Sequence, residues 1–236
     1  MPASECGTRA YGHGRIEGGE EVVPHSIPWQ VKLFPGCGGT LISPRHVLSA
    51  AHCFCKIGQN IEWCQSQCSR WSVGLGMHNI MDRDGLIVKV QHISIPEDFV
   101  FTENDIENDF ALLTLASEVK LNDKIRIACL PNINMSHDFL VGKDLTVSGW
   151  GRGSDGVNCV ECMLHRAQYP GITNEYCQEL YNTDPEGVCE KAAEFHPQIT
   201  ESHLCAGIPF PSEKSHSSGD SGGMLCRSFI SKYLSN

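Results

Sequence analysis

Cysteine residues occur along almost the whole chain, and they set the first limit on its fold. There are 13 among 236 residues, from Cys6 to Cys226. A chain in the reducing cytosol seldom keeps so many, so the pattern indicates an oxidising compartment and several disulfides. Because 13 is odd, at least one thiol is free, or pairs with another chain or with a cysteine outside this sequence. The first 15 residues contain no apolar run typical of a signal peptide, so we expect the sequence to be incomplete.

The composition favours a globular, turn-rich protein. Hydrophobic residues make up 41% and charged residues 19%, with 23 glycines and 12 prolines, a balance that argues against disorder and against helical bundles. A formal net charge of −10 argues against nucleic acid or an anionic membrane surface as a partner. No segment reaches the ~18 apolar residues of a membrane-spanning helix. We therefore expect neither nucleic-acid binding nor a membrane span.

Short segments of β type alternate with turn clusters, a spacing that suits an antiparallel barrel or sandwich. They are residues 29–34, 39–43, 86–91, 110–115 and 145–148. The best helical signal is at residues 173–181, where Thr173 is a suitable N-cap. Two loops, residues 54–70 and 182–194, are long and contain cysteines.

The segment Ser218-Gly-Asp-Ser-Gly-Gly223 is the strongest candidate for a catalytic nucleophile. A serine hydroxyl needs a base to remove its proton and donors to stabilise the oxyanion that forms. Glycines on both sides of Ser221 let the backbone bend so that the N–H groups of Gly219 and Ser221 converge on one point. Taken alone, the segment is also compatible with an ordinary turn.

Two further segments offer a base and an acid. The stretch from Thr40 runs from an apolar strand into small residues that end on His52, and histidine, which titrates near neutral pH, can act as base and then as acid. Asp109 lies at the mouth of an apolar strand, where it could hold the imidazole in the required tautomer. Alone, each has a plain structural reading: His52 as a packing or surface residue, like His46, and Asp109 as a turn carboxylate.

Together these segments resemble the chymotrypsin/trypsin-like serine proteases (peptidase S1 type). The order His52, Asp109, Ser221 is the chain order of the catalytic triad in that family, and the resemblance extends from residue 15 to residue 225. The other matching landmarks are Pro28-Trp-Gln-Val31, Cys37-Gly-Gly-Thr40, Ala128-Cys-Leu-Pro131, Val147-Ser-Gly-Trp-Gly151 and Leu204-Cys-Ala-Gly207.

The resemblance implies an all-β fold of two antiparallel six-stranded β-barrels packed face to face, with the triad in the cleft between them. Residues 1–15 would be a propeptide remnant and residues 16–236 the protease domain, with the first barrel at about 16–125 and the second at about 126–236. Only 15 residues follow Ser221, so we expect a chain truncated at its C-terminus and a second barrel that is incomplete there.

The resemblance also implies activation by cleavage after Arg15. The freed amine of Ile16 would pair with Asp220 and order the oxyanion-binding backbone beside Ser221. An α-amino group with a pKa of ~7.7–8.0 is mostly protonated at neutral pH, so its burial requires a carboxylate partner.

Three disulfides are implied by the resemblance: Cys37 with Cys53, Cys177 with Cys205, and Cys6 with Cys129. No partner is assigned to Cys55, Cys64, Cys68, Cys159, Cys162, Cys189 or Cys226, and Cys226 is the best candidate for the odd thiol. His52, Cys53, Cys55, Cys64 and Cys68 have the ligand types of a zinc site, but zinc would sequester the catalytic histidine. We expect local disulfides there, no metal and no cofactor; calcium binding at Asp82 and Asp84 is left open.

Ser215 departs from the trypsin-like pattern. It lies six residues before the nucleophile, at the base of the primary specificity pocket that the family implies. Without a carboxylate there, a Lys or Arg side chain of the substrate would enter an uncompensated pocket, so a large apolar or aromatic residue is favoured.

The expected function is that of a secreted serine endopeptidase, made as a zymogen. Its partners would be protein or peptide substrates, an activating protease and protein inhibitors. The sequon at Asn134 is consistent with export. The alternative is a catalytically incompetent, truncated protease-like fragment, or a binding module that retains the triad residues.

Overall fold

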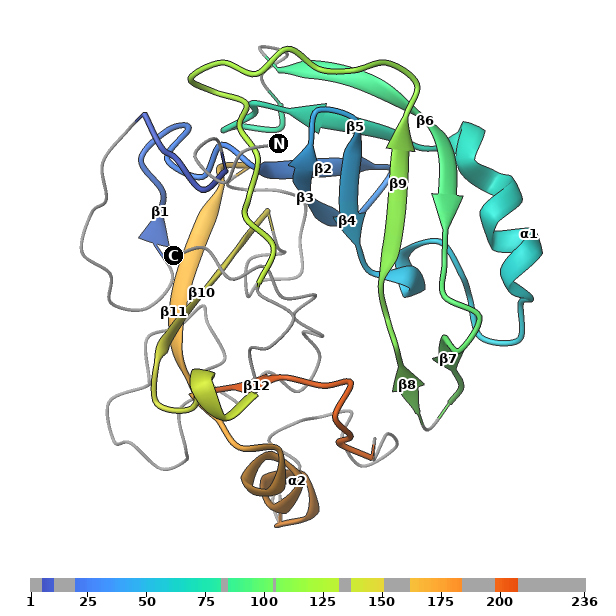
Figure 1. Ribbon diagram of the computed structural model, residues 1–236, viewed down its shortest axis with the longest axis vertical. Coiled ribbons are helices and arrows are strands. Elements are labelled where there is room, and N and C mark those ends of the chain that lie inside the picture. Colours follow the sequence, from blue (N-terminus) through green and yellow to red (C-terminus); the bar gives the residue numbers. More distant parts are fainter. Residues whose placement is uncertain are drawn as a thin grey trace.

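A computed structural model of the chain describes residues 6–10, 20–81, 85–103, 105–131, 137–150, 162–183 and 198–207. Within these ranges the molecule is mostly β, with few and short helices (Figure 1). The all-β prediction is confirmed. No helix in the described ranges has the length and apolar content that crossing a membrane requires.

Six antiparallel strands close into a barrel in the first half of the chain, in the order β2-β3-β4-β9-β6-β5. They are β2 (Gln30–Phe34), β3 (Gly38–Ser43), β4 (His46–Ser49), β5 (Ser72–Leu75), β6 (Leu86–Ser94) and β9 (Ala111–Leu115). Alternate side chains point inward; in β9, Ala111, Leu113 and Leu115 are buried. This closed barrel is consistent with the first of the two expected barrels.

The barrel interior is filled by aliphatic side chains from every strand. Leu33, Leu41, Val47, Val73, Ile93, Leu113 and Leu115 have no exposed surface. Full burial of such a side chain contributes about 1.5–3 kcal/mol, so the barrel is a firm support for residues at its rim.

A second sheet joins distant parts of the chain. Its strands are β1 (Glu20–Glu21), β11 (His165–Ile172) and β10 (Asp144–Gly149) in that order, and β12 (Cys205–Ala206) also pairs with β11. A small cluster of Val22, Ile27, Trp29, Ala128 and Leu164 packs where the two halves meet. Residues 151–161 and 208–236, which belong to the expected second barrel, lie outside the described residues.

Short elements lie around the barrel. Helix α1 (Ile61–Ser66) and the 3-10 turn η2 (Gln67–Arg70) fall in the long loop that follows His52, and β7 (Val100–Phe101) pairs with β8 (Ile106–Glu107) as a small hairpin. The remaining elements are the 3-10 turns η1 (Ala51–Cys53) and η3 (His137–Leu140) and helix α2 (Asn174–Thr183). In Figure 1, α1 lies outside β6 at the right of the view, while α2 lies below β12 at the bottom.

Candidate active site

Strand pairing brings His52 and Asp109 to the same end of the barrel. Strand β4 ends at Ser49, which pairs with Ala111 at the start of β9. His52 follows three residues after Ser49 in η1, and Asp109 precedes Ala111 by two. The antiparallel pairing of β4 with β9 thus brings together two residues that are 57 positions apart in the sequence.

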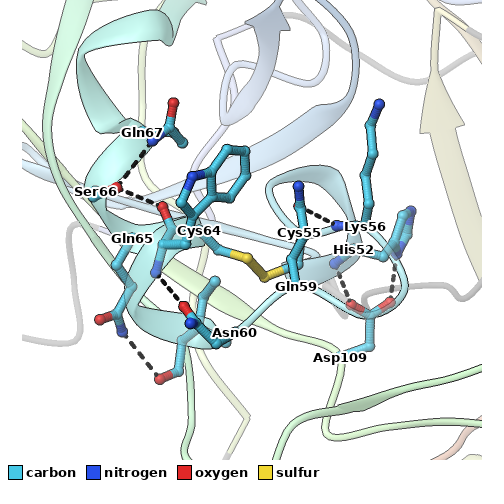
Figure 2. The surroundings of a disulfide bond; sticks show 12 residues. His52, Cys55, Lys56, Gln59, Asn60, Cys64, Gln65, Ser66, Gln67 and Asp109 are labelled. Carbon is cyan, nitrogen blue, oxygen red and sulfur yellow. Dashed lines mark hydrogen bonds and ion pairs between the residues drawn. A yellow bond between two sulfur atoms is a disulfide. The ribbon is translucent and has the colours of Figure 1, made fainter.

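Asp109 contacts His52 at two points. Nδ1 of His52 lies 2.6 Å from Oδ2 of Asp109, and the backbone N–H of His52 donates to Oδ1 at 2.9 Å (Figure 2). The Asp109 side chain is 6% exposed and that of His52 is 37% exposed. An ionised carboxylate only accepts hydrogen bonds, so Nδ1 of His52 carries a hydrogen, and in the neutral ring Nε2 then keeps its lone pair. The buried acid therefore fixes both the position and the tautomer of a partly exposed base.

The turn before β9 aims the Asp109 side chain. Asn108 has a φ of 51°, the left-handed region in which asparagine is tolerated better than most residues. The N–H of Phe110 donates to the Asn108 carbonyl at 2.8 Å. The Asn108 amide donates to the backbone and side-chain oxygens of Asp98, each at 3.0 Å. No role for Asn108 was predictable from the sequence, because a left-handed turn leaves no periodic signal.

The β7–β8 hairpin borders the histidine. The ring centroids of Phe101 and His52 are 6.3 Å apart, and Phe99 lies 6.2 Å from Phe101. Phe101 pairs with Ile106 across the hairpin, and Asp109 is three residues farther on. Phe101 was not predictable from the sequence, since strands of two residues have no detectable alternation.

Two disulfides hold the segment that carries His52. Cys37 is bonded to Cys53 and Cys55 to Cys64, whereas the thiol of Cys68 is free and half-buried. Sulfurs in disulfides are not zinc ligands, so the zinc hypothesis loses three of its four cysteines. In the part of the chain that the structure describes, one group of possible ligand residues lies close together, Cys37, His52 and Cys53, and it fails for the same reason.

Other disulfides tie distant segments together. Cys6 is bonded to Cys129 and Cys177 to Cys205, so the structure contains the three pairs that the resemblance implied. Cys162 is also disulfide-bonded. Cys159, Cys189 and Cys226 lie outside the described residues.

Several predicted site residues fall outside the described ranges. They are the nucleophile Ser221 with its neighbours Gly219 and Asp220, Ser215 of the specificity pocket, and the activation residues Arg15 and Ile16. Asp82, Asp84 and Asn134 also lie outside them. Of the predicted triad, the structure places His52 and Asp109 together.

Comparison with known proteins points to one group. The family model named Trypsin matches residues 16–229. The chain is 30% identical to the clotting factor G beta subunit of Tachypleus tridentatus, covering 89% of this chain and 65% of that protein. It is 32% identical to chymotrypsin-C of Bos taurus (94% and 77%) and 32% identical to kallikrein-8 of Homo sapiens (91% and 74%).

Proposed function

The chain belongs to the trypsin-like serine proteases, and on that premise we propose that it is a serine endopeptidase made as a zymogen. The observation that carries the proposal is the two-point contact between His52 and Asp109. A carboxylate that only stabilised its own turn would not contact both the ring and the backbone N–H of His52.

In the proposed reaction, Ser221 Oγ attacks the scissile carbonyl carbon while Nε2 of His52 takes the hydroxyl proton. The N–H groups of Gly219 and Ser221 stabilise the oxyanion. The imidazolium then gives its proton to the leaving amine, and water hydrolyses the acyl-enzyme by the same steps. Asp109 stabilises the imidazolium and remains ionised throughout.

Activation is proposed to follow hydrolysis after Arg15. The new amine of Ile16 would pair with Asp220, the residue between the two oxyanion donors. Two observations on the described residues support this: β1 begins four residues after Ile16, and the Glu20 carboxylate accepts from the buried Arg166 guanidinium at 2.9 Å. The segment that leads to the new terminus is therefore anchored at its far end.

Substrate choice is proposed to depend on Ser215. A neutral residue there leaves a basic side chain without a counter-charge, so a Phe, Tyr or Leu before the cleaved bond is preferred. We also propose secretion, supported by the disulfides, with protein substrates, an activating protease and protein inhibitors as partners.

The test is active-site labelling of the activated chain. Residues 11–15, immediately before Ile16, are replaced by the recognition sequence of a protease of known specificity, so that Cys6 and its disulfide are kept. The chain is then cut, and a biotinylated phosphonate ester with a phenylalanine side chain is added. We expect one label per chain on Ser221, and none in the Ser221→Ala control or in the uncut chain. A folded, cut chain that takes no label would favour the incompetent fragment or binding module instead.

The same assay tests the specificity pocket. Phosphonates with a phenylalanine or an arginine side chain are compared at equal concentration. We expect the phenylalanine probe to react faster, because Ser215 offers no negative charge. A faster reaction with the arginine probe would refute the proposed role of Ser215 in substrate choice. It would not count against the proposed triad.

A further inference from the structure

His203 connects the second half of the chain to the hairpin beside the candidate active site. It precedes the disulfide-bonded Cys205 by two residues and is 8% exposed. Its Nε2 lies 2.9 Å from the backbone carbonyl oxygen of Ile106 in β8, a residue 97 positions away in the sequence. This contact therefore links the segment just before β12 to strand β8.

The hydrogen-bond pattern around the ring fixes its tautomer. The backbone N–H of Thr200 points at Nδ1, at 3.1 Å. Since a backbone N–H can only donate, Nδ1 must accept, and the ring hydrogen is then on Nε2. His203 is therefore the donor to the Ile106 carbonyl.

The side of the link that carries His203 is held firmly. The Asn174 amide, in the first turn of α2, donates to the carbonyls of Thr200 at 2.8 Å and His203 at 3.2 Å. The His203 N–H donates to the Thr200 carbonyl at 3.0 Å. Next to it, the Cys177–Cys205 disulfide joins α2 to β12, which pairs with β11.

The other side of the link is the β7–β8 hairpin. The Ile106 side chain is 2% exposed, and Ile106 pairs with Phe101, whose ring lies beside His52. Asp109 follows Ile106 by three residues. A shift of the Ile106 carbonyl would therefore displace both Phe101 and the turn that orients Asp109.

We infer that His203 is a positioning residue for the triad: its Nε2–H holds the β7–β8 hairpin, and with it Phe101 and Asp109, in register with the second half of the chain. The inference rests on the proposed protease activity, since it assigns His203 a role in that reaction. Bonds formed by His52 and Ser221 depend on geometry at the level of an ångström, and those two residues come from different halves of the sequence.

Two variants distinguish the effect of the Nε2–H donor of His203 from the effect of the size of its side chain. His203→Leu keeps an apolar side chain of similar reach and removes the donor, whereas His203→Gln keeps an N–H. We expect His203→Leu to lower kcat by about 10-fold with KM changed by less than about 2-fold, and His203→Gln to regain most of the loss. His92→Leu, on the exposed face of β6, is the matched control and should leave both constants unchanged.

Equal losses in the Leu and Gln variants, or an unchanged kcat in His203→Leu, would overturn the inference. A readout that needs no catalysis keeps it distinct from the protease proposal. Amide hydrogen exchange over residues 105–109 of the uncut chain should be faster in His203→Leu and unchanged in His203→Gln. A wild-type chain that does not react with the phosphonate would contradict the proposed function. Unchanged amide exchange in His203→Leu would instead contradict the proposed role of the His203–Ile106 hydrogen bond.

Discussion

Single residues of the candidate site differ in how far the sequence reveals them. His52 and Asp109 stand in short motifs whose order is diagnostic, so their meeting was predictable before any geometry was known. Asn108, Phe101 and His203 were not, because each acts through a contact that only the folded chain creates: a left-handed turn, a ring beside a ring, and a donor that crosses 97 positions. Residue types in a sequence indicate which side chains can take part in catalysis. The residues that hold those side chains in place are identified only from their tertiary positions.

The two-point contact makes a sharp prediction for Asp109→Asn. The His52 backbone N–H would hold the amide oxygen, which turns the NH₂ group toward Nδ1. Facing a donor, Nδ1 must accept, so the hydrogen moves to Nε2 and the base can no longer take a proton. We expect kcat to fall by about 10⁴-fold, the size of this effect in serine protease triads, with the thermal midpoint nearly unchanged.

The control is Glu103→Gln, which removes the same charge from an exposed position on the neighbouring hairpin. It should keep kcat within about 2-fold, because an exposed charge is well screened. Similar losses in the two variants would mean that net charge near the site, rather than the tautomer of His52, is responsible.

At the scale of elements, four of the six barrel strands and β10 of the second sheet were predictable, whereas the irregular elements were not. Segments 29–34, 39–43, 86–91, 110–115 and 145–148 correspond to β2, β3, β6, β9 and β10. Thr173 caps α2 as expected, its hydroxyl accepting from the Tyr176 N–H at 3.1 Å. Strand β11 was missed because Pro170 and Gly171 interrupt its pattern, and six-residue α1 is too short to show helical periodicity.

Helix α1 is held by the Cys55–Cys64 disulfide, and this predicts a local stabilisation. Cys64 is fully buried and Cys55 3% exposed, so the bridge joins the helix to the barrel core close to His52. For the double variant Cys55→Ala with Cys64→Ala, we expect the unfolding free energy to fall by about 2–3 kcal/mol, since the closed loop is short. Urea unfolding measures it, with Cys68→Ser as the control that leaves the bridge intact. Equal midpoints for the double variant and the wild type would show that packing alone holds α1.

At the scale of the whole molecule, residues 6–10 are attached to the protein body at several points. The Cys6–Cys129 disulfide is joined by a hydrogen bond from the Gly7 N–H to the Ile127 carbonyl at 2.9 Å. The Arg9 guanidinium lies 4.7 Å from the centroid of the Trp29 ring, where burial first and then the nearby charge of Arg166 lower the pKa of Arg9. The family resemblance implied the disulfide, but nothing in the sequence marked the stacking of Arg9 on Trp29.

These contacts predict that the segment before Arg15 stays with the protein after cleavage. Because the bond broken lies between Arg15 and Ile16, the Cys6–Cys129 bridge should keep the two pieces together on a non-reducing gel and release a short peptide on reduction. Removing the bridge with Cys6→Ser and Cys129→Ser should lower the unfolding free energy of the uncut chain by about 2–5 kcal/mol, because the loop that it closes is long. An Arg15→Gln chain, treated with the protease that cuts the native chain after Arg15, gives the uncut reference. If the double-serine chain unfolds at the wild-type urea concentration, the hydrogen bonds and the Arg9–Trp29 contact hold the segment without help from the disulfide.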